Sequence, residues 1–185
     1  GTSGRNGFRS WTSTDLVNWK ALGYAYQRSA RAWGSGSFWA PEVTRYRDKF
    51  YMVFSCSGPD RQAGMRLAIA VADTPAGPFK EMHMPWLDNG WSCIDAHLFI
   101  DDDNTPYAFF ARVGADPEPN KHLWGIVHGV KLAADLSKAV GEPVMCVRAE
   151  QDWEQMDPKL RSLCNEGPFV LKHKGIYYMT WSAGH

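Results

Sequence analysis

The sequence predicts an all-β fold, and within that class a β-propeller, from three observations. Apolar residues seldom recur at helical spacing, and the 185 residues read instead as short strand-like runs separated by turn residues. Three segments far apart in the chain align with one another without gaps, which indicates an internal repeat. Each repeat has room for about four strands, and four-stranded units repeated along a chain are typical of propeller blades.

The three aligned segments each have the pattern of a β-hairpin. They are residues 39–55 (WAPEVTRYRDKFYMVFS), residues 95–111 (DAHLFIDDDNTPYAFFA) and residues 166–182 (EGPFVLKHKGIYYMTWS). In each segment a small residue comes second, a polar turn lies in the middle, and an aromatic residue opens the return strand. A tight polar turn between two such runs predicts two antiparallel strands.

Further strands are expected before and between the hairpins. Residues 7–12, 65–72 and 124–132 form strand-like runs bounded by turn residues. The chain is then expected to hold the outer strands of one blade, two whole blades and the inner hairpin of a fourth, roughly three blades. Because the sequence starts with Gly1 rather than Met and stops at His185, just after a strand-like run, we expect residues 1–185 to be part of a single β-propeller catalytic domain that is truncated at both ends.

The repeat also predicts a functional pocket. The first strand of each propeller blade lines the central axis, so equivalent positions in successive blades face one another. The gap-free alignment makes Trp39, Asp95 and Glu166 the first positions of the three hairpins. A single carboxylate at a strand end is usually solvated, but two at the same repeat position favour a function. A tryptophan and two carboxylates are therefore expected to converge on one axial pocket.

Composition narrows the kinds of partner. Lysine plus arginine and aspartate plus glutamate each number 20, so the net charge is zero. Nucleic acid is not expected as a partner, because proteins that bind nucleic acid usually carry an excess of basic residues. No run approaches the ~20 apolar residues of a membrane-spanning helix, so no membrane partner is expected. The chain contains 9 Trp, 7 Tyr and 9 Phe, which indicates either a large β core or platforms for the apolar faces of sugars.

The cysteines and acidic residues do not indicate a metal site. Four cysteines (Cys56, Cys93, Cys146 and Cys164) lack metal-ligand spacing and allow three disulfide pairings, and we favour free, mostly buried thiols. The run Asp101-Asp102-Asp103-Asn104 begins like a calcium loop but lacks its spaced ligands, so a hairpin turn is the better interpretation. No cofactor is expected to be required, and a structural calcium ion is not indicated.

Four motifs, in order, resemble those of glycoside hydrolase family 43, which includes arabinofuranosidases, arabinanases and β-xylosidases. They are Ser13-Thr14-Asp15-Leu16-Val17-Asn18-Trp19, Trp39-Ala40-Pro41-Glu42-Val43, the run Ile94-Asp95-Ala96-His97 with the residues that follow it to Asp103, and Asn165-Glu166-Gly167-Pro168. The resemblance covers essentially the whole chain but only part of the usual domain. It implies a five-bladed β-propeller, an oligo- or polysaccharide substrate containing arabinose or xylose, and a secreted or periplasmic location.

By this resemblance Glu166 would be the general acid of an inverting glycosidase. Asp95 would orient that acid and raise its pKa, and Trp39 would form a wall of the sugar site. The family's general base lies at the start of the first blade's inner strand, which falls upstream of Gly1. The residues 1–185 alone are therefore expected to lack activity. An acid and a base about 6.5–9.5 Å apart, with water between them, suit inversion.

Two further residues are candidates for substrate binding. His97, two residues after Asp95, would contact sugar hydroxyls or else fill the axis as a structural residue. Arg112 stands at the base of the loop 113–122, which is expected to rim the pocket, and would bind a hydroxyl or pair with a carboxylate.

Two alternatives remain open from the sequence. A non-catalytic carbohydrate-binding propeller, or an inactive fragment, would use Trp39 and rim aromatics without cleaving the sugar, but would not need both Asp95 and Glu166. A retaining propeller glycosidase would also use three axial carboxylates, but the Arg-Asp-Pro and Glu-Cys motifs typical of that group do not occur here.

Overall fold

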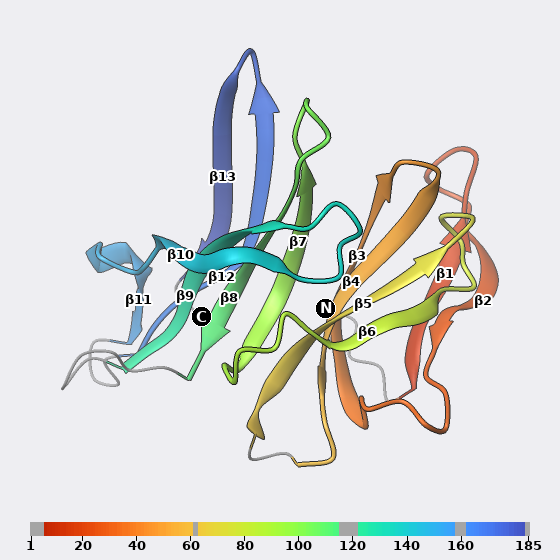
Figure 1. Ribbon diagram of the computed structural model, residues 1–185, viewed down its shortest axis with the longest axis horizontal. Coiled ribbons are helices and arrows are strands. Elements are labelled where there is room, and N and C mark those ends of the chain that lie inside the picture. The colour runs from red at the N-terminus through yellow and green to blue at the C-terminus, as the bar shows by residue number, and fades with distance from the viewer. Residues whose placement is uncertain (1–5, 61–62, 115–121, 158–161, 184–185) are drawn as a thin grey trace.

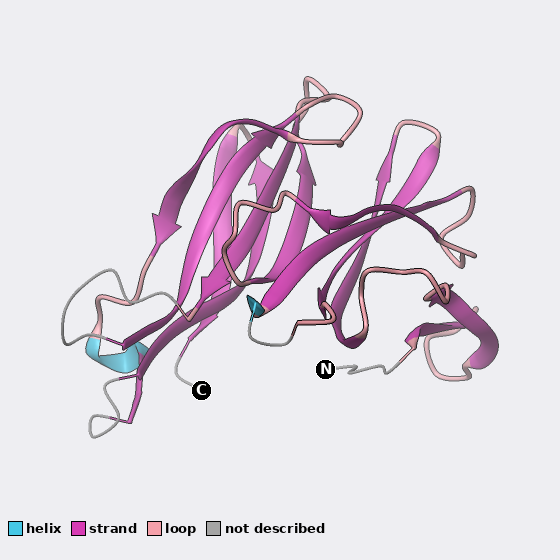
Figure 2. Ribbon diagram, turned by 60° about the horizontal axis from the view of Figure 1, so that its bottom comes forward, coloured by secondary structure: helices cyan, strands magenta, loops and turns pink. Residues whose placement is uncertain are grey.

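The computed structural model describes residues 6–60, 63–114, 122–157 and 162–183 of the 185-residue chain. The strands are β1 (Gly7–Thr12), β2 (Lys20–Gln27), β3 (Gly36–Tyr46), β4 (Lys49–Ser57), β5 (Met65–Ala72), β6 (Lys80–Trp86), β7 (Cys93–Ile100), β8 (Pro106–Val113), β9 (His122–Leu132), β10 (Ala139–Val147), β11 (Gln155–Asp157), β12 (Ser162–His173) and β13 (Ile176–Ala183). Within these ranges helix is confined to short turns such as the 3₁₀ helix η2 (Asp152–Glu154), so the all-β prediction is confirmed (Figure 2). No helix in these ranges is long and apolar enough to cross a membrane.

The strands follow one another as antiparallel meanders. β1 and β2 form a two-stranded sheet, and β3-β4-β5-β6 form a four-stranded sheet in chain order. β7-β8-β9-β10 repeat that order, and a short parallel pairing of β9 with the start of β12 joins them to the β12–β13 hairpin. The hairpins β3–β4, β7–β8 and β12–β13 stand side by side with their turns on the same side (Figure 1). This is the strand arrangement that the repeat predicted.

The four-stranded sheet β3–β6 is buried on both faces. In β5 the residues Leu67 and Ile69 face one hydrophobic cluster, which also contains Leu98 and Phe110 of the next sheet. The alternate residues of β5 are alanines that face a second cluster, which contains Phe8 and Tyr26 of β1 and β2. Since successive side chains of a strand point to opposite faces, the alternation of large and small residues in MRLAIAVA fits β5 between two different neighbours. β5 therefore helps to pack the β3–β6 sheet against the sheets on both sides of it.

Each first strand contains a β-bulge near its start. Trp39 pairs with Ser55 but Glu42 pairs with Val53, so three steps in β3 match two steps in β4. The same excess of one residue occurs in the other hairpins, between the pairs Ile94–Ala111 and His97–Phe109 and between the pairs Glu166–Ser182 and Phe169–Thr180. A bulge of this kind bends the strand and changes the direction of its side chains.

The register corrects the gap-free alignment by one residue in β7. Asp95 is the structural equivalent of Ala40 and Gly167, not of Trp39 and Glu166, because Ile94 takes the paired position before the bulge. All three equivalent residues have positive φ angles: 46° at Ala40, 56° at Asp95 and 59° at Gly167. The physical reason is the turn, because residues 101–105 connect β7 to β8, whereas two-residue turns close the other hairpins. This turn is three residues longer and each paired strand is one residue shorter, so the partners before the bulge are 17 residues apart in β7–β8 and 16 apart in the other two hairpins.

Candidate active site

The structure brings Asp95 next to Gly167, the residue that follows Glu166. The backbone N–H of Gly167, the residue after Glu166, donates a hydrogen bond to Asp95 Oδ2 over 3.1 Å. The backbone N–H of Asp95 donates in turn to the buried Ser55 Oγ over 3.0 Å. These bonds link β4, β7 and β12, which belong to three different hairpins. The left-handed backbone of Asp95 and Gly167 allows both bonds, since it turns the carboxylate and the N–H toward one another.

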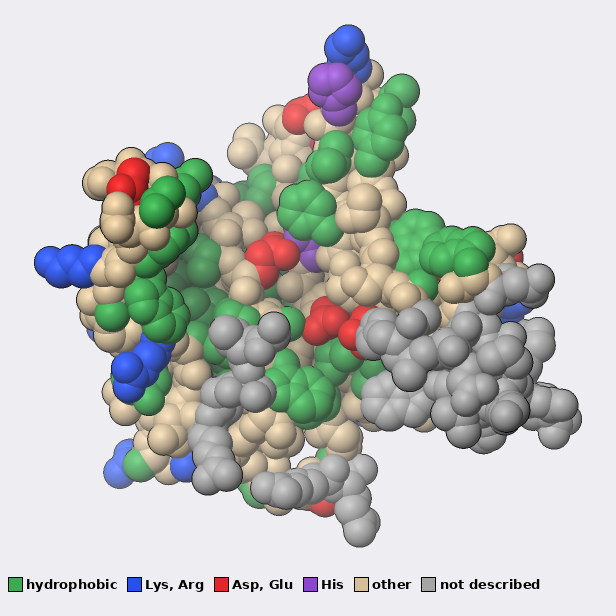
Figure 3. Space-filling model, turned by 180° about the vertical axis from the view of Figure 1, so that it is seen from behind, with side chains coloured by type: hydrophobic (Ala, Val, Ile, Leu, Met, Phe, Trp, Pro, Cys, Tyr) green, Lys and Arg blue, Asp and Glu red, His purple; other side chains and the backbone are tan. Residues whose placement is uncertain are grey.

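Trp39 lies on β3, next to the Ser55 that contacts Asp95. It pairs with Ser55 across β3 and β4, and Ser55 is the residue that accepts the N–H of Asp95. About two-fifths of Trp39 is exposed (40%), so its indole has a free face. Figure 3 shows acidic side chains gathered in the middle of this face of the molecule, between the projecting hairpins. Trp39, Asp95 and Glu166, which the repeat grouped together, therefore lie on the first strands of three neighbouring hairpins, β3, β7 and β12.

The pKa of a buried thiol reflects both carboxylates. Cys164 Sγ lies 3.5 Å from Glu166 Oε2, within reach of an S–H···O hydrogen bond. Burial, followed by the negative charge and hydrogen bond of Glu166 and the charge of Asp95, raises the pKa of Cys164 to about 12. The carboxylates of Glu166 and Asp95 thus both lie close enough to Cys164 to raise the pKa of its thiol. All four cysteines lie in the described part of the chain and are free, and three of them are buried, as expected from the sequence.

His97 is held by protein groups on both sides of its ring. Its side chain is buried, with Nδ1 2.9 Å from Glu42 Oε1 and Nε2 3.1 Å from the carbonyl oxygen of Val170. The ring also packs on Phe169, with centroids 4.6 Å apart. A carboxylate and a carbonyl oxygen, both hydrogen-bond acceptors, thus occupy the two ring nitrogens of His97. This arrangement corresponds to the structural alternative for His97 rather than to a contact with a sugar hydroxyl.

Arg112 packs on an aromatic ring. Its guanidinium carbon lies 4.1 Å from the centroid of Trp91, a cation–π contact. Arg112 and Phe110 lie on the same side of β8, and Phe110 belongs to the cluster shared with the β3–β6 sheet. Residues 115–121 of the loop that begins after Arg112 lie outside the described residues, so its expected contact with substrate stays a prediction.

Sequence reasoning missed two groups that border the site. Glu42 lies in the first aligned segment but was assigned no role, and it accepts bonds from Thr44 and the backbone of Leu98 besides its contact with His97. Glu154 lies in the connection between β10 and β12 and bonds to Asn165, the residue before Glu166. No repeat covers that connection, so only its proximity in sequence to the Asn-Glu-Gly-Pro motif could have pointed to Glu154.

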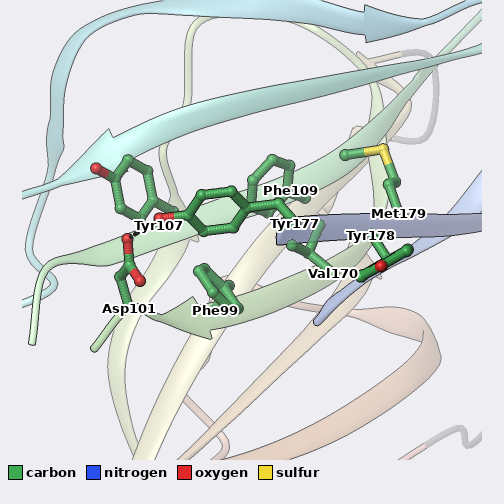
Figure 4. Close-up of a pocket in the computed structure, with 8 residues that line it drawn as sticks. All are labelled: Phe99, Asp101, Tyr107, Phe109, Val170, Tyr177, Tyr178 and Met179. Carbon is green, nitrogen blue, oxygen red and sulfur yellow. Dashed lines mark hydrogen bonds between the residues drawn. The ribbon is translucent and has the colours of Figure 1, made fainter. Parts of the chain in front are cut away.

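The pocket in Figure 4 is a separate feature. It has a volume of about 350 Å³ and lies between β7–β8 and β12–β13, lined by Phe99, Asp101, Tyr107, Phe109, Val170, Tyr177, Tyr178 and Met179. Hydrogen bonds from Lys172 and Tyr177 hold the pKa of Asp101 low, at about 2. Asp101 is the first residue after β7 and lies six residues from Asp95, at most about 20 Å away at the rise of an extended strand. In the described ranges no group of three His, Cys, Asp or Glu residues is placed to hold a metal ion, and Asp101 is engaged by Lys172 instead.

Comparisons with known proteins agree with this architecture. The family described as glycosyl hydrolases family 43 matches residues 1–185. The chain is 28% identical over 181 residues to a xylan 1,3-β-xylosidase of a Vibrio species, covering 93% of this chain and 31% of that protein.

Two solved structures are also similar. The crystal structure of a thermostable family-43 glycoside hydrolase superposes with a TM-score of 0.88 at 38% identity, over 98% of this chain and 57% of that one. An endo-1,4-β-xylanase from Bacteroides thetaiotaomicron VPI-5482 has a TM-score of 0.79 at 33% identity, over 100% of this chain and 58% of that one. The chain thus spans between 31% and 58% of the length of these relatives.

Proposed function

The chain belongs to glycosyl hydrolase family 43, and from that premise we propose that the protein is a glycosidase that cleaves xylan- or arabinan-type polysaccharides. The names of its relatives support this substrate class, since they include a xylan 1,3-β-xylosidase and an endo-1,4-β-xylanase. An uncharged glycan also suits a chain whose net charge is zero. The strand arrangement supports a five-bladed propeller as the fold of the whole domain.

We propose an inverting mechanism in which Glu166 is the general acid. Its carboxyl group would donate a proton to the glycosidic oxygen as the bond to the anomeric carbon breaks. A carboxylate on the opposite face of the sugar would take a proton from water as that water attacks. We place this base on the inner strand of the blade to which β1 and β2 belong, upstream of Gly1.

The observation that carries the proposal is the hydrogen bond from the Gly167 N–H to Asp95 Oδ2. It fixes the backbone next to Glu166 and brings the Asp95 carboxylate to the residue that follows Glu166. Asp95 would therefore orient Glu166 through the backbone of Gly167.

Trp39 supplies the apolar part of the proposed site. Its exposed indole would pack against the apolar face of a sugar ring bound over Asp95 and Glu166. Arg112 stays a weaker proposal for substrate binding, since its described neighbour is Trp91.

Glu166→Gln in the complete protein tests the assignment. The substitution keeps the shape of the side chain and removes its proton, so hydrolysis of unactivated xyloside or arabinoside linkages should fall by about 10²–10⁴-fold. An aryl glycoside with a good leaving group should lose much less, because it needs little protonation. Equal loss on both substrates would refute Glu166 as the acid, and binding of oligosaccharide by a wild-type protein that cleaves neither would favour the carbohydrate-binding alternative. Proton NMR of the first-formed anomer tests inversion.

A further inference from the structure

Glu154 is a deeply buried carboxylate that the proposed mechanism does not use. Only 2% of the residue is exposed. Oε2 accepts the backbone N–H groups of Glu150 and Gln151 over 2.7 and 2.8 Å, and Oε1 accepts Asn165 Nδ2 over 2.9 Å and Trp181 Nε1 over 3.4 Å. Four donors thus surround the two oxygens, and none of them can accept a proton in return.

This donor set requires an ionised carboxylate. Burial by itself raises the pKa of Glu154, but the hydrogen bonds from Gln151, Glu150, Asn165 and Trp181 outweigh it, and the net shift is downward. A neutral group would have to place a hydrogen against one of the donors. A buried anion with this many bonds is costly to assemble, so its position beside the proposed acid calls for an explanation.

Glu154 binds one residue of β12, the strand that carries Glu166, and one residue of its partner strand β13. Asn165 immediately precedes Glu166 on β12, and Trp181 immediately precedes Ser182, which pairs with Glu166 on β13. Asn165 is fully buried, and its Oδ1 has no hydrogen-bond partner in the described part of the structure. The amide is therefore oriented by Glu154, which draws Nδ2 toward its carboxylate.

On the other side of Glu166, Gly167 donates its N–H to Asp95. The residues before and after Glu166 are thus each held by a different carboxylate, Glu154 through a side chain and Asp95 through the backbone. A short segment fixed at both neighbours has little freedom to rotate, so the direction of the Glu166 side chain depends on both contacts. Displacement of a reacting group by about 1 Å can cost roughly 10²-fold in rate.

We infer that Glu154 is a positioning residue for Glu166, acting through Asn165 and Trp181. The inference rests on the proposed function, because it assumes that Glu166 delivers a proton. Glu154 itself touches no substrate. Its effect should therefore appear where proton delivery limits the rate and should be small where it does not.

The experiment compares two substrates in the complete protein. Glu154→Gln should lower kcat on an unactivated xyloside or arabinoside by about 10–100-fold and kcat on an activated aryl glycoside by less than about 3-fold, with KM little changed. Trp181→Phe removes one donor and keeps an aromatic ring, so it should show the same selectivity on a smaller scale. Glu150→Gln is the matched control, since its exposed side chain pairs with Arg148 and its backbone N–H is retained.

The double variant Glu154→Gln/Asn165→Asp supplies a rescue. The amide introduced at position 154 would donate to the carboxylate introduced at position 165, which restores a donor–acceptor pair of reversed polarity between the same two positions. Most of the loss on unactivated substrate should be recovered in the double variant but not in Asn165→Asp alone, where two carboxylates would face each other. If Glu154→Gln does not fold, as thermal melting would show, the double variant and Trp181→Phe still give the substrate comparison.

Equal losses on both substrates would overturn the inference and leave Glu154 with a structural role only. So would unchanged kinetics in folded Glu154→Gln or in Trp181→Phe. The proposed function fails separately, if Glu166→Gln itself shows no dependence on the leaving group. Selective loss in Glu166→Gln without selective loss in the Glu154 series would leave the function standing and reject the inference.

Discussion

Substitution of His97 tests whether this residue binds sugar or holds the strands together. Its two ring nitrogens contact Glu42 on β3 and the Val170 carbonyl on β12, so a residue of β7 bridges three hairpins. His97→Ala removes both bonds and leaves the partly buried Glu42 without the imidazole that it contacts. His97→Asn keeps a donor near the Nδ1 position, and His97→Gln keeps one near Nε2, so each retains one bond.

The magnitude follows from the two contacts. A hydrogen bond to a charged group contributes about 1.5–3 kcal/mol and one to a neutral carbonyl about 0.5–1.5 kcal/mol. The Glu42 side chain is 32% exposed, so the lower half of the first range applies. With the lost packing on Phe169, His97→Ala should cost about 3 kcal/mol of unfolding free energy, and His97→Asn and His97→Gln about 1–2 kcal/mol each.

Urea denaturation of the complete protein measures these costs, with the midpoint and slope compared between variants. His173→Ala is the control, since His173 is an exposed histidine at the end of β12 and should change stability by less than about 0.5 kcal/mol. KM for an aryl xyloside or arabinoside is measured on the same folded samples. We expect it to stay within about 3-fold of wild type in the Asn and Gln variants, because less than ~0.7 kcal/mol of binding would be lost.

A large rise in KM with no loss of stability would refute the structural role and restore His97 to the substrate site. Wild-type stability in His97→Ala would show that neither contact contributes in solution.

Three more predictions follow from the backbone, the thiols and the buried carboxylate. Ala40→Gly should stabilise the protein by up to about 1 kcal/mol in urea denaturation, because Ala40 has a φ of 46° that only glycine adopts without strain; destabilisation would contradict the bulge geometry. At pH 8 a thiol reagent should label the exposed Cys146 first, since burial raises the pKa values of Cys56, Cys93 and Cys164 to about 12. If the three buried thiols reacted as fast in the folded protein as after denaturation, this packing would be contradicted. The pKa of Glu154 is lowered in the folded state, so the ionised carboxylate stabilises the fold above the ordinary pKa of 4.5, and this stabilisation is lost as the pH falls below that value. Between about pH 5 and pH 3 the unfolding free energy of Glu154→Gln should therefore fall less than that of wild type, and parallel falls would argue against an ionised Glu154.

Much of the fold could be predicted because it depends on local pattern. The run MRLAIAVA alternates large and small residues at a period of two, and β5 has the predicted bounds, Met65–Ala72. The three hairpins form where polar turns divide strand-like runs. The register of β7 could not be predicted in the same way, because the aspartate-rich sequence 101–103 does not say how many residues the turn contains. That number depends on contacts across the fold, such as the ion pair of Asp101 with Lys172 of β12.

Residues of the candidate site could likewise be predicted where they belong to the repeat and could not where they lie outside it. Asp95 and Glu166 could be brought together from the sequence because a repeat relates their strands. Glu154 could not, because it lies in a connection outside the repeat, and its importance depends on how that connection closes over Asn165. His97 shows a third case, in which the residue is near the site but its nitrogens are satisfied by Glu42 and Val170, which only the packed structure determines.

The bulge explains why Asp95 contacts Gly167 although the gap-free alignment was wrong by one residue in β7. In β3 and β12 the position with positive φ is filled by Ala40 and Gly167, residues with little or no side chain, whereas in β7 it is filled by Asp95. A left-handed residue other than glycine costs about 1–2 kcal/mol. At Asp95 this cost is offset in part by a hydrogen bond, since the turned backbone directs the carboxylate to the N–H of Gly167. The methyl side chain of Ala40 has the same strain and can accept no such bond, so glycine at this position should be a gain in stability, whereas glycine at position 95 would remove the group that holds the backbone beside Glu166.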